Sequence, residues 1–305
     1  MWGSETYLIQ GRYSVMVKGK RALLGDIMCN ARVKHYPDGS RRLYAFSADI
    51  LREPGWEQEG RRGKSGRAQG EAAAAAADDN LLRSKRRARA AVQDIALSNE
   101  FRFFVTLTLD KSKVNRYDVS EVTRKLNNWL DNNVRRKGLA YILVPERHKD
   151  GAIHFHGFFN DALPVVDSGT LDTGAAKPRK PRSEAQRARL LADGAHIVYN
   201  LPNWSMGFST AIELYGDYRA AVNYVCKYIT KAADKVGGRW YYSGGALARP
   251  EVTYHRADFA QLCDRYAERC SVYEVEALGC RGLVIELEAN ENGNELVGLL
   301  SRLRD

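Results

Sequence analysis

The sequence predicts an α+β fold in which helices pack on one face of a central antiparallel sheet. The run from Phe103 to Leu109 is rich in β-branched and aromatic residues, which is typical of a strand. Apolar residues from Val119 to Val134 recur at helical spacing. Two further apolar runs, Leu139 to Pro145 and Ala152 to Phe159, flank a turn and predict a hairpin. Strand, helix and hairpin in this order indicate a sheet with a helix packed on it.

Local signals set the ends of these elements. Asp118 precedes Glu121 by three residues, which resembles the capping box at the start of a helix. Gly138 is the type of residue that ends one. Lys149-Asp150-Gly151 is a turn sequence between the two strands of the hairpin.

The remaining segments extend the same architecture. A basic helix is predicted from about residue 80 to 98. The stretch 161–195 is rich in Gly, Pro, Ser and charge, and we interpret it as an insertion made of a loop and a short basic helix. His196 to Asn200 and Phe208 to Leu214 are predicted as strands, and 218–234 as a helix.

Composition shifts divide the chain into four regions. Residues 1–56 are predicted to be a β-rich N-terminal extension, and 57–79 a low-complexity linker that leads into a helix. The main domain spans 80–235 and contains the insertion. Residues 236–305 form a C-terminal accessory region whose role the sequence does not indicate.

The charge balance favours an anionic partner. The 305 residues include 47 Lys and Arg against 37 Asp and Glu, a formal net charge of +10. Nucleic acid is the first candidate for such a surplus, and a basic protein without such a partner is the alternative.

Several protein classes are excluded by simpler features. No apolar run approaches 18 residues, so no transmembrane helix and no membrane partner are expected. The N-terminus lacks a basic start followed by an apolar stretch, so no signal peptide is expected. Five cysteines without a CxxC pair argue against a zinc ribbon and a disulfide framework, and fit the cytoplasm.

The first candidate for chemistry is His154-Phe155-His156 on the second strand of the hairpin. Side chains alternate along a strand, so the two imidazoles share one face. Two such imidazoles can bind one divalent metal, although most pairs of this spacing have no such role.

Glu146 is the second candidate. If the turn centres on Asp150, Glu146 lies directly opposite His154, and directly opposed residues point to the same face. A slip of one residue would move the carboxylate to the other face, where it is a surface glutamate. Two imidazoles and a carboxylate suit Mg²⁺ or Mn²⁺ that holds a phosphate oxygen, and also Zn²⁺ or Fe²⁺.

The third candidate is the run Tyr224 to Lys231 on the last helix. At about 100° per residue, Tyr224, Lys227, Tyr228 and Lys231 fall within an arc of about 100°. Two phenols and two ammonium groups are an unusual choice for a core stripe. The alternative is an amphipathic surface helix whose tyrosines are half packed against the sheet.

Together these groups suit tyrosine attack on a phosphodiester. A phenol with a pKa of about 10 is a poor nucleophile at neutral pH. A neighbouring ammonium group stabilises the phenolate, and a metal on the phosphate lowers the charge barrier. The products are a phosphotyrosine and a free hydroxyl, so bond energy is conserved and no nucleotide cofactor is needed.

The three segments resemble the three motifs of the HUH endonuclease superfamily, named for histidine, hydrophobic residue, histidine. Phe104-Val105-Thr106-Leu107-Thr108 is similar to its first motif and His154-Phe155-His156 to its second. The doubled Tyr-x-x-Lys at 224–231 resembles the third, in the two-tyrosine form of rolling-circle initiators (Rep) from small single-stranded DNA phages and plasmids. The resemblance covers about residues 100–235.

The resemblance implies a fold and a set of roles. The fold is an HUH-type palm, an RRM-like or ferredoxin-like antiparallel sheet whose central strand carries the histidines. His154 and His156 are then metal ligands for Mg²⁺ or Mn²⁺, with Glu146 as third ligand. Tyr224 and Tyr228 act in alternation, aided by Lys227 and Lys231. Thr106 and Thr108 have a structural role beneath the site.

The implied activity is site-specific nicking of single-stranded DNA at a replication origin, presented as a hairpin. A 5′-phosphotyrosine and a free 3′-OH result, and rejoining closes circles. No fused helicase is present, so a host helicase and DNA polymerase would be partners in the bacterial cytoplasm. Alternatives are an HUH-type relaxase or transposase, or a non-catalytic nucleic-acid-binding protein.

Overall fold

The computed structural model divides the chain into two compact units, Met1–Gly66 with Pro250–Asp305, and Arg67–Arg249. The residues that it describes are 6–9, 12–17, 20–23, 28–52, 71–175, 177–275, 279–289 and 300–302. Most of the predicted linker lies outside the described residues. Its last part, from Glu71, belongs to a helix.

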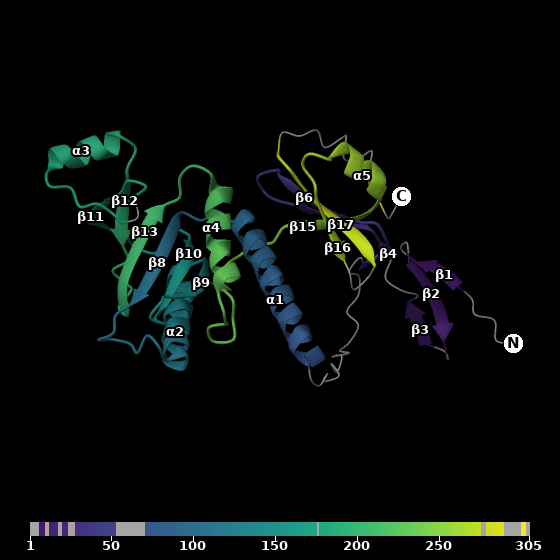
Figure 1. Cartoon of the computed structure of the whole chain (residues 1–305), viewed down its shortest axis with the longest axis horizontal. Helices are drawn as coiled ribbons and strands as arrows, with labels where there is room; N and C mark the ends of the chain where they lie inside the picture. Colours follow the sequence, from purple (N-terminus) through teal and green to yellow (C-terminus); the bar gives the residue numbers. More distant parts are fainter. Residues whose placement is uncertain are drawn as a thin grey trace. The chain divides into compact units, whose positions relative to one another are not determined.

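The larger unit is built on a seven-stranded sheet (Figure 1). Its strand order is β11-β12-β13-β8-β10-β9-β14, and every neighbouring pair is antiparallel. The strands are β8 (Phe103–Leu109), β9 (Tyr141–Arg147), β10 (Ile153–Phe159), β11 (Val166–Asp172), β12 (His196–Asn200), β13 (Gly207–Glu213) and β14 (Tyr242–Gly244). The α+β fold with a central antiparallel sheet is therefore confirmed.

Four helices accompany this sheet: α1 (Glu71–Leu97), α2 (Val119–Lys137), α3 (Glu184–Ala192) and α4 (Tyr218–Lys231). The ends of α2 lie where the sequence predicts them. The Asp118 side chain accepts hydrogen bonds from the backbone N–H groups of Ser120 and Glu121. Gly138 ends the helix with a φ of 73°, a backbone conformation that favours glycine.

The main core lies between α2 and one face of the sheet. Val122, Leu126 and Leu130 of α2 are buried against alternate residues of the central strands. These strand residues are Phe103, Val105, Leu107 and Leu109 of β8, Leu143 of β9, and Ile153, Phe155 and Phe159 of β10. A helix of period 3.6 and strands of period 2 thus bury their apolar sets against each other.

The opposite face is covered in part by α4, which packs in turn against α1. Val222, Val225, Cys226 and Ile229 of α4 are buried, and this spacing turns one side of the helix inward. The prediction that helices pack on a single face is wrong. The helical period shows that α4 has an apolar side but cannot show which face of the sheet that side covers.

The predicted insertion contributes more than a loop and a helix. β11 pairs with β12 and forms one edge of the sheet, and α3 stands beside these strands (Figure 1). Sequence analysis missed β11 because an exposed edge strand with a bulge between Asp167 and Thr170 lacks apolar alternation. The short basic helix is confirmed as α3.

The smaller unit holds a six-stranded antiparallel sheet of order β16-β17-β6-β5-β15-β18. Its elements are β5 (Ala31–His35), β6 (Arg41–Phe46), β15 (Glu251–Ala257), α5 (Phe259–Arg265), β16 (Ser271–Val275), β17 (Cys280–Leu287) and β18 (Leu300–Arg302). β5 pairs with β15, and β6 with β17, so strands from both ends of the chain share one sheet. One face packs on Phe259 and Leu262 of α5.

Two smaller sheets complete this unit. One contains β1 (Thr6–Ile9), β2 (Arg12–Val17) and β3 (Lys20–Leu23), and the other β4 (Met28–Cys29) and β7 (Leu51–Arg52). The larger unit runs to Arg249, past residue 235, where the sequence places the boundary. Within the described ranges, none of the helices has the length and hydropathy that crossing a membrane requires.

Candidate active site

The hairpin of β9 and β10 has the register that the turn predicts. Glu146 lies directly opposite His154, as expected for a turn centred on Asp150. On the other side of β10, His154 pairs with Thr108 and His156 with Thr106. Directly opposed residues point to the same face of a sheet. The two histidines, the two threonines and Glu146 therefore share one face, the face that α4 covers in part.

Both imidazoles are held by threonine hydroxyls beneath them. Nδ1 of His156 lies 3.1 Å from Thr106 Oγ1, and Nδ1 of His154 lies 3.2 Å from Thr108 Oγ1. The two histidines are only 9% and 8% exposed. A hydroxyl can donate or accept, so each threonine fixes the ring while allowing either tautomer. This is the positioning role that the sequence gives to the threonines.

Glu146 contacts the histidine diagonal to it rather than the one directly opposite. His156 Nε2 donates a hydrogen bond to Glu146 Oε2, with 2.9 Å between the atoms. The ring of His154 instead stacks on His148, with 3.7 Å between ring centroids. The structure therefore brings two of the three predicted ligands into direct contact, with the third beside them on the same face.

Both histidines are held in the neutral form. Burial is the largest cause that lowers the pKa of His154 to about 4, and nearby His148, His156 and Arg116 lower it further. Burial also lowers the pKa of His156, against the opposing effect of the Glu146 carboxylate. A neutral imidazole is the form that binds a metal ion.

The donor set fits a divalent cation by its chemistry, since it offers two neutral imidazoles and one carboxylate. Threonine partners that accept either tautomer leave each Nε2 available for a ligand bond. As the side chains lie, however, no three His, Cys, Asp or Glu side chains in the described part of the chain form a group that could hold a metal ion. The metal site stays a prediction.

The two candidate tyrosines lie over this face. Tyr228 stacks on His156, with 4.3 Å between ring centroids and 5° between ring planes. Its hydroxyl donates a hydrogen bond to the Tyr224 hydroxyl over 2.8 Å. Tyr224 is 49% exposed, and the edge of its ring meets Phe104 of β8. The phenols on one helical face therefore reach the histidine site.

The environment keeps the Tyr228 phenol protonated. Burial is the largest cause that raises its pKa, followed by the hydrogen bond to Tyr224 and the charge of Glu146. The position of α4 fixes this arrangement, because the Asp217 side chain caps its start by accepting from Arg219 and Ala220 backbone N–H groups.

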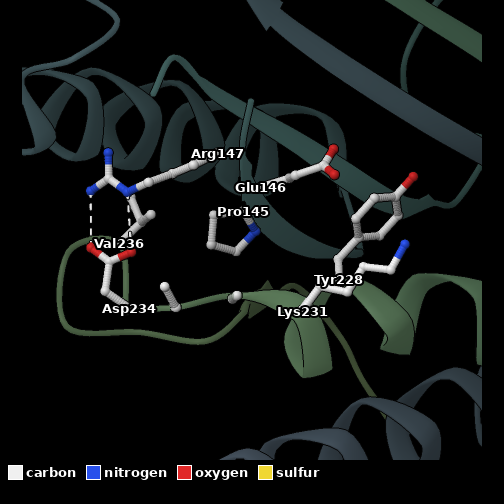
Figure 2. Close-up of a pocket in the computed structure, with 9 residues that line it drawn as sticks. Pro145, Glu146, Arg147, Tyr228, Lys231, Asp234 and Val236 are labelled. Atoms are coloured by element: carbon white, nitrogen blue, oxygen red, sulfur yellow. Dashed lines mark hydrogen bonds and ion pairs between the residues drawn. The ribbon is translucent and has the colours of Figure 1, made fainter. Parts of the chain in front are cut away.

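A cavity of about 180 Å³ lies beside Tyr228. Figure 2 shows Glu146, Tyr228 and Lys231 on one side of it and the ion pair of Arg147 with Asp234 on the other. Lys231 is exposed and adds a cation next to the phenol and the carboxylate. Lys227 is also exposed but is not among the residues that line this cavity.

Sequence reasoning missed two residues of this site. His148 stacks on His154, and Phe104 lies between the rings of His156 and Tyr224. Alternation provides the signal for both, since Phe104 precedes Thr106 by two residues and His148 follows Glu146 by two. His148 lies just past the end of β9, where strand alternation no longer determines the direction of a side chain.

Comparison with known proteins supports a role in replication. Residues 102–233 match a family model of replication-associated proteins, the ORF2 type. The matched segment begins just before β8 and ends just after α4, so it contains both histidines, Glu146 and both tyrosines. Searches of curated proteins and of solved structures found no significant match.

Proposed function

We propose that this chain initiates rolling-circle replication by nicking single-stranded DNA through tyrosine transesterification and later rejoining the strands. The observation that carries the proposal is the stacking of Tyr228 on His156, with the Tyr224 hydroxyl 2.8 Å from that of Tyr228. Two potential nucleophiles thus meet next to a pair of imidazoles and a carboxylate. The replication family matched by residues 102–233 agrees with this chemistry.

The reaction exchanges one phosphate ester for another. A tyrosine oxygen attacks the phosphorus of a phosphodiester, and the bond from phosphorus to the 3′ oxygen breaks. The phenol loses its proton, and the leaving 3′ oxygen gains one. The products are a 5′-phosphotyrosine and a 3′-OH, and the reverse reaction joins a 3′-OH to the held 5′ end.

The paired tyrosines suit repeated strand transfer. While one phenol holds the 5′ end, the other can cleave the regenerated origin. The hydrogen bond between Tyr228 and Tyr224 supports a shared site, because both oxygens lie within one hydrogen bond of each other. Lys227 and Lys231 would favour the phenolate forms by their charge, with Lys231 lining the cavity beside Tyr228.

In this proposal His154, His156 and Glu146 hold Mg²⁺ or Mn²⁺, which supplies positive charge to the phosphate when bound. The threonines keep the two imidazole rings oriented, and the depressed pKa values keep them neutral. The hydrogen bond between His156 and Glu146 is the contact that such binding would replace.

The proposed substrate is origin DNA in single-stranded or hairpin form. The released 3′-OH would prime a DNA polymerase while a separate helicase unwinds the duplex, both supplied by a bacterial host in whose cytoplasm the protein acts. A relaxase or transposase of the same chemistry would use the same residues. The paired tyrosines favour an initiator over a single-tyrosine transposase.

A covalent-adduct assay tests the proposal. The protein is mixed with labelled single-stranded DNA from the replicon that encodes it, with Mn²⁺ or with chelator, and run on a denaturing protein gel. We expect metal-dependent label at the position of the protein, absent in the Tyr224→Phe/Tyr228→Phe double variant. Each single variant should retain one cleavage but lose repeated strand transfer.

Tyr215→Phe is the matched control, because Tyr215 is 50% exposed on the same unit and stacks on His196 away from the tyrosine pair. It should form the adduct as the wild type does. An adduct that persists in the double variant would contradict the proposed nucleophiles. DNA binding without any adduct would favour the non-catalytic alternative.

A further inference from the structure

An exposed phenylalanine lies on the same face of the sheet as the candidate site. Phe208 of β13 is 69% exposed, more than any other large hydrophobic side chain in the described ranges. Surface apolar residues are common on proteins, so exposure by itself indicates nothing. What distinguishes Phe208 is its position in the sheet.

Phe208 belongs to the register row that carries the site. It lies directly opposite Thr108 on β8, Thr108 lies opposite His154 on β10, and His154 lies opposite Glu146 on β9. All four side chains therefore point to one face. Neighbouring strands are about 4.8 Å apart, so Phe208 lies about 10 Å from His154 across the sheet.

The helical cover on this face does not extend to Phe208. Near the opposite end of β8, Phe104 contacts Tyr224 of α4. Ile212, which pairs with Phe104, is half-buried, whereas Phe208, four residues earlier on the same strand, is open to solvent. The row thus ends in an aromatic ring that is uncovered beside the proposed chemistry.

The backbone beneath Phe208 is held firmly. Trp204 Nε1 donates to the Thr108 carbonyl over 3.1 Å, and Asp110 N donates to the Met206 carbonyl over 3.0 Å. A Cβ on Gly207 would lie 2.1 Å from the Thr108 carbonyl oxygen, so only glycine allows this close approach of the strands. An exposed ring on a fixed strand loses little entropy when a flat partner stacks on it.

Cationic side chains follow directly after β8. Lys111, Lys113 and Arg116 line a hollow of about 340 Å³, and the two lysines are exposed. This loop begins where Leu109 pairs with Gly207, the residue before Phe208. Aromatic rings for the bases beside cations for the phosphates are the combination by which proteins bind single-stranded nucleic acid.

We infer that Phe208 is a positioning residue that stacks on a base of the single-stranded DNA close to the scissile phosphate. This inference rests on the proposed function for the identity of the ligand. The row from Phe208 to Glu146 then holds a base at one end and the reacting phosphate at the other. Phe208 does not touch the reacting atoms.

DNA binding measured without catalysis tests this role. Binding of a fluorescently labelled single strand is measured in chelator for the wild type, Phe208→Ala and Phe208→Trp. Stacking of one base predicts a Kd about 5- to 150-fold weaker for Phe208→Ala, with affinity recovered in Phe208→Trp. Val166→Ala is the control, because Val166 is 55% exposed on β11 of the same sheet and outside the row.

An abasic scan identifies the stacked base. Single bases near the nick site are removed one at a time, and the affinity of each strand is measured for wild type and Phe208→Ala. We expect one position where base removal weakens wild-type binding but leaves Phe208→Ala unchanged. At saturating DNA, the adduct should form at the wild-type rate in Phe208→Ala, which separates positioning from catalysis.

Two outcomes would overturn the inference. Phe208→Ala could bind every strand as the wild type does, as expected if Phe208 contacts a protein or only solvent. Every abasic strand could also lose the same affinity in both proteins. Because binding is measured in chelator, a missing adduct would contradict the proposed nicking activity while leaving this test intact.

Discussion

On the α2 side of the seven-stranded sheet, β8 presents Val105 and Leu107 and β10 presents Phe155, all fully buried. On the α4 side, the same two strands present Thr106, Thr108 and the histidine pair. Successive residues of one strand therefore build a dry core and a polar site. The difference shows that in this unit stability and chemistry are interleaved at single-residue spacing.

The two faces depend on different kinds of contact. The α2 face excludes water through apolar packing, which is largely insensitive to the exact orientation of polar atoms. The α4 face keeps two neutral imidazoles in place through hydrogen bonds of 3.1 and 3.2 Å to threonines. Substitutions on the first face should mainly change folding, and those on the second mainly the reaction.

The largest effect is expected from one substitution made on both faces. Phe155→Ala removes a fully buried ring that packs edge-on against Tyr242, and it should lower the free energy of unfolding by about 3–5 kcal/mol. Phe208→Ala removes the same atoms from the exposed face and should change it by less than about 0.5 kcal/mol. Urea denaturation followed by fluorescence of Trp204 and Trp240 measures both. Equal effects would contradict the division between the faces.

Much of this division could be predicted from the sequence. Alternation places Thr106, Thr108 and both histidines on one face, and the turn at Asp150 sets the register that brings Glu146 to it. These features follow from contacts a few residues apart in the chain. The helical period also predicts that Tyr224 and Tyr228 lie together, and the structure confirms it.

Other features depend on contacts that local patterns do not encode. Glu146 bonds to His156 rather than to His154, which its rotamer and the stacking of His148 on His154 decide. The pairing of β5 with β15 joins segments more than 200 residues apart. The position of α4 on the face opposite α2 likewise depends on packing across the sheet.

A smaller effect is expected from acid. The folded pKa of His154, about 4, lies below the ordinary value of 6.5, so the unfolded chain takes up a proton first as the pH falls. The free energy of unfolding should be unaffected above about pH 6.5 and should fall between pH 6.5 and 4, by at most about 3 kcal/mol in metal-free protein. Urea titrations at several pH values measure it.

His154→Gln is the control for this dependence. Glutamine does not titrate, so the variant should lose less stability than the wild type over the same pH range. Carboxylates that titrate at low pH affect both proteins and cancel in the difference. Parallel curves for the two proteins would mean that His154 is not the group whose protonation opposes folding.

The smallest effect on folding is expected from the threonines, where the two faces can be separated most clearly. Thr106→Val removes the hydroxyl that holds His156 and should lower the free energy of unfolding by only about 1 kcal/mol. If the ring needs this partner for the proposed metal, the Mn²⁺ concentration for half-maximal adduct formation should rise about 10- to 100-fold. Thr106→Ser keeps the hydroxyl and should retain both properties. Wild-type metal dependence in Thr106→Val would show instead that stacking between Tyr228 and His156 orients the ring without help from the threonine.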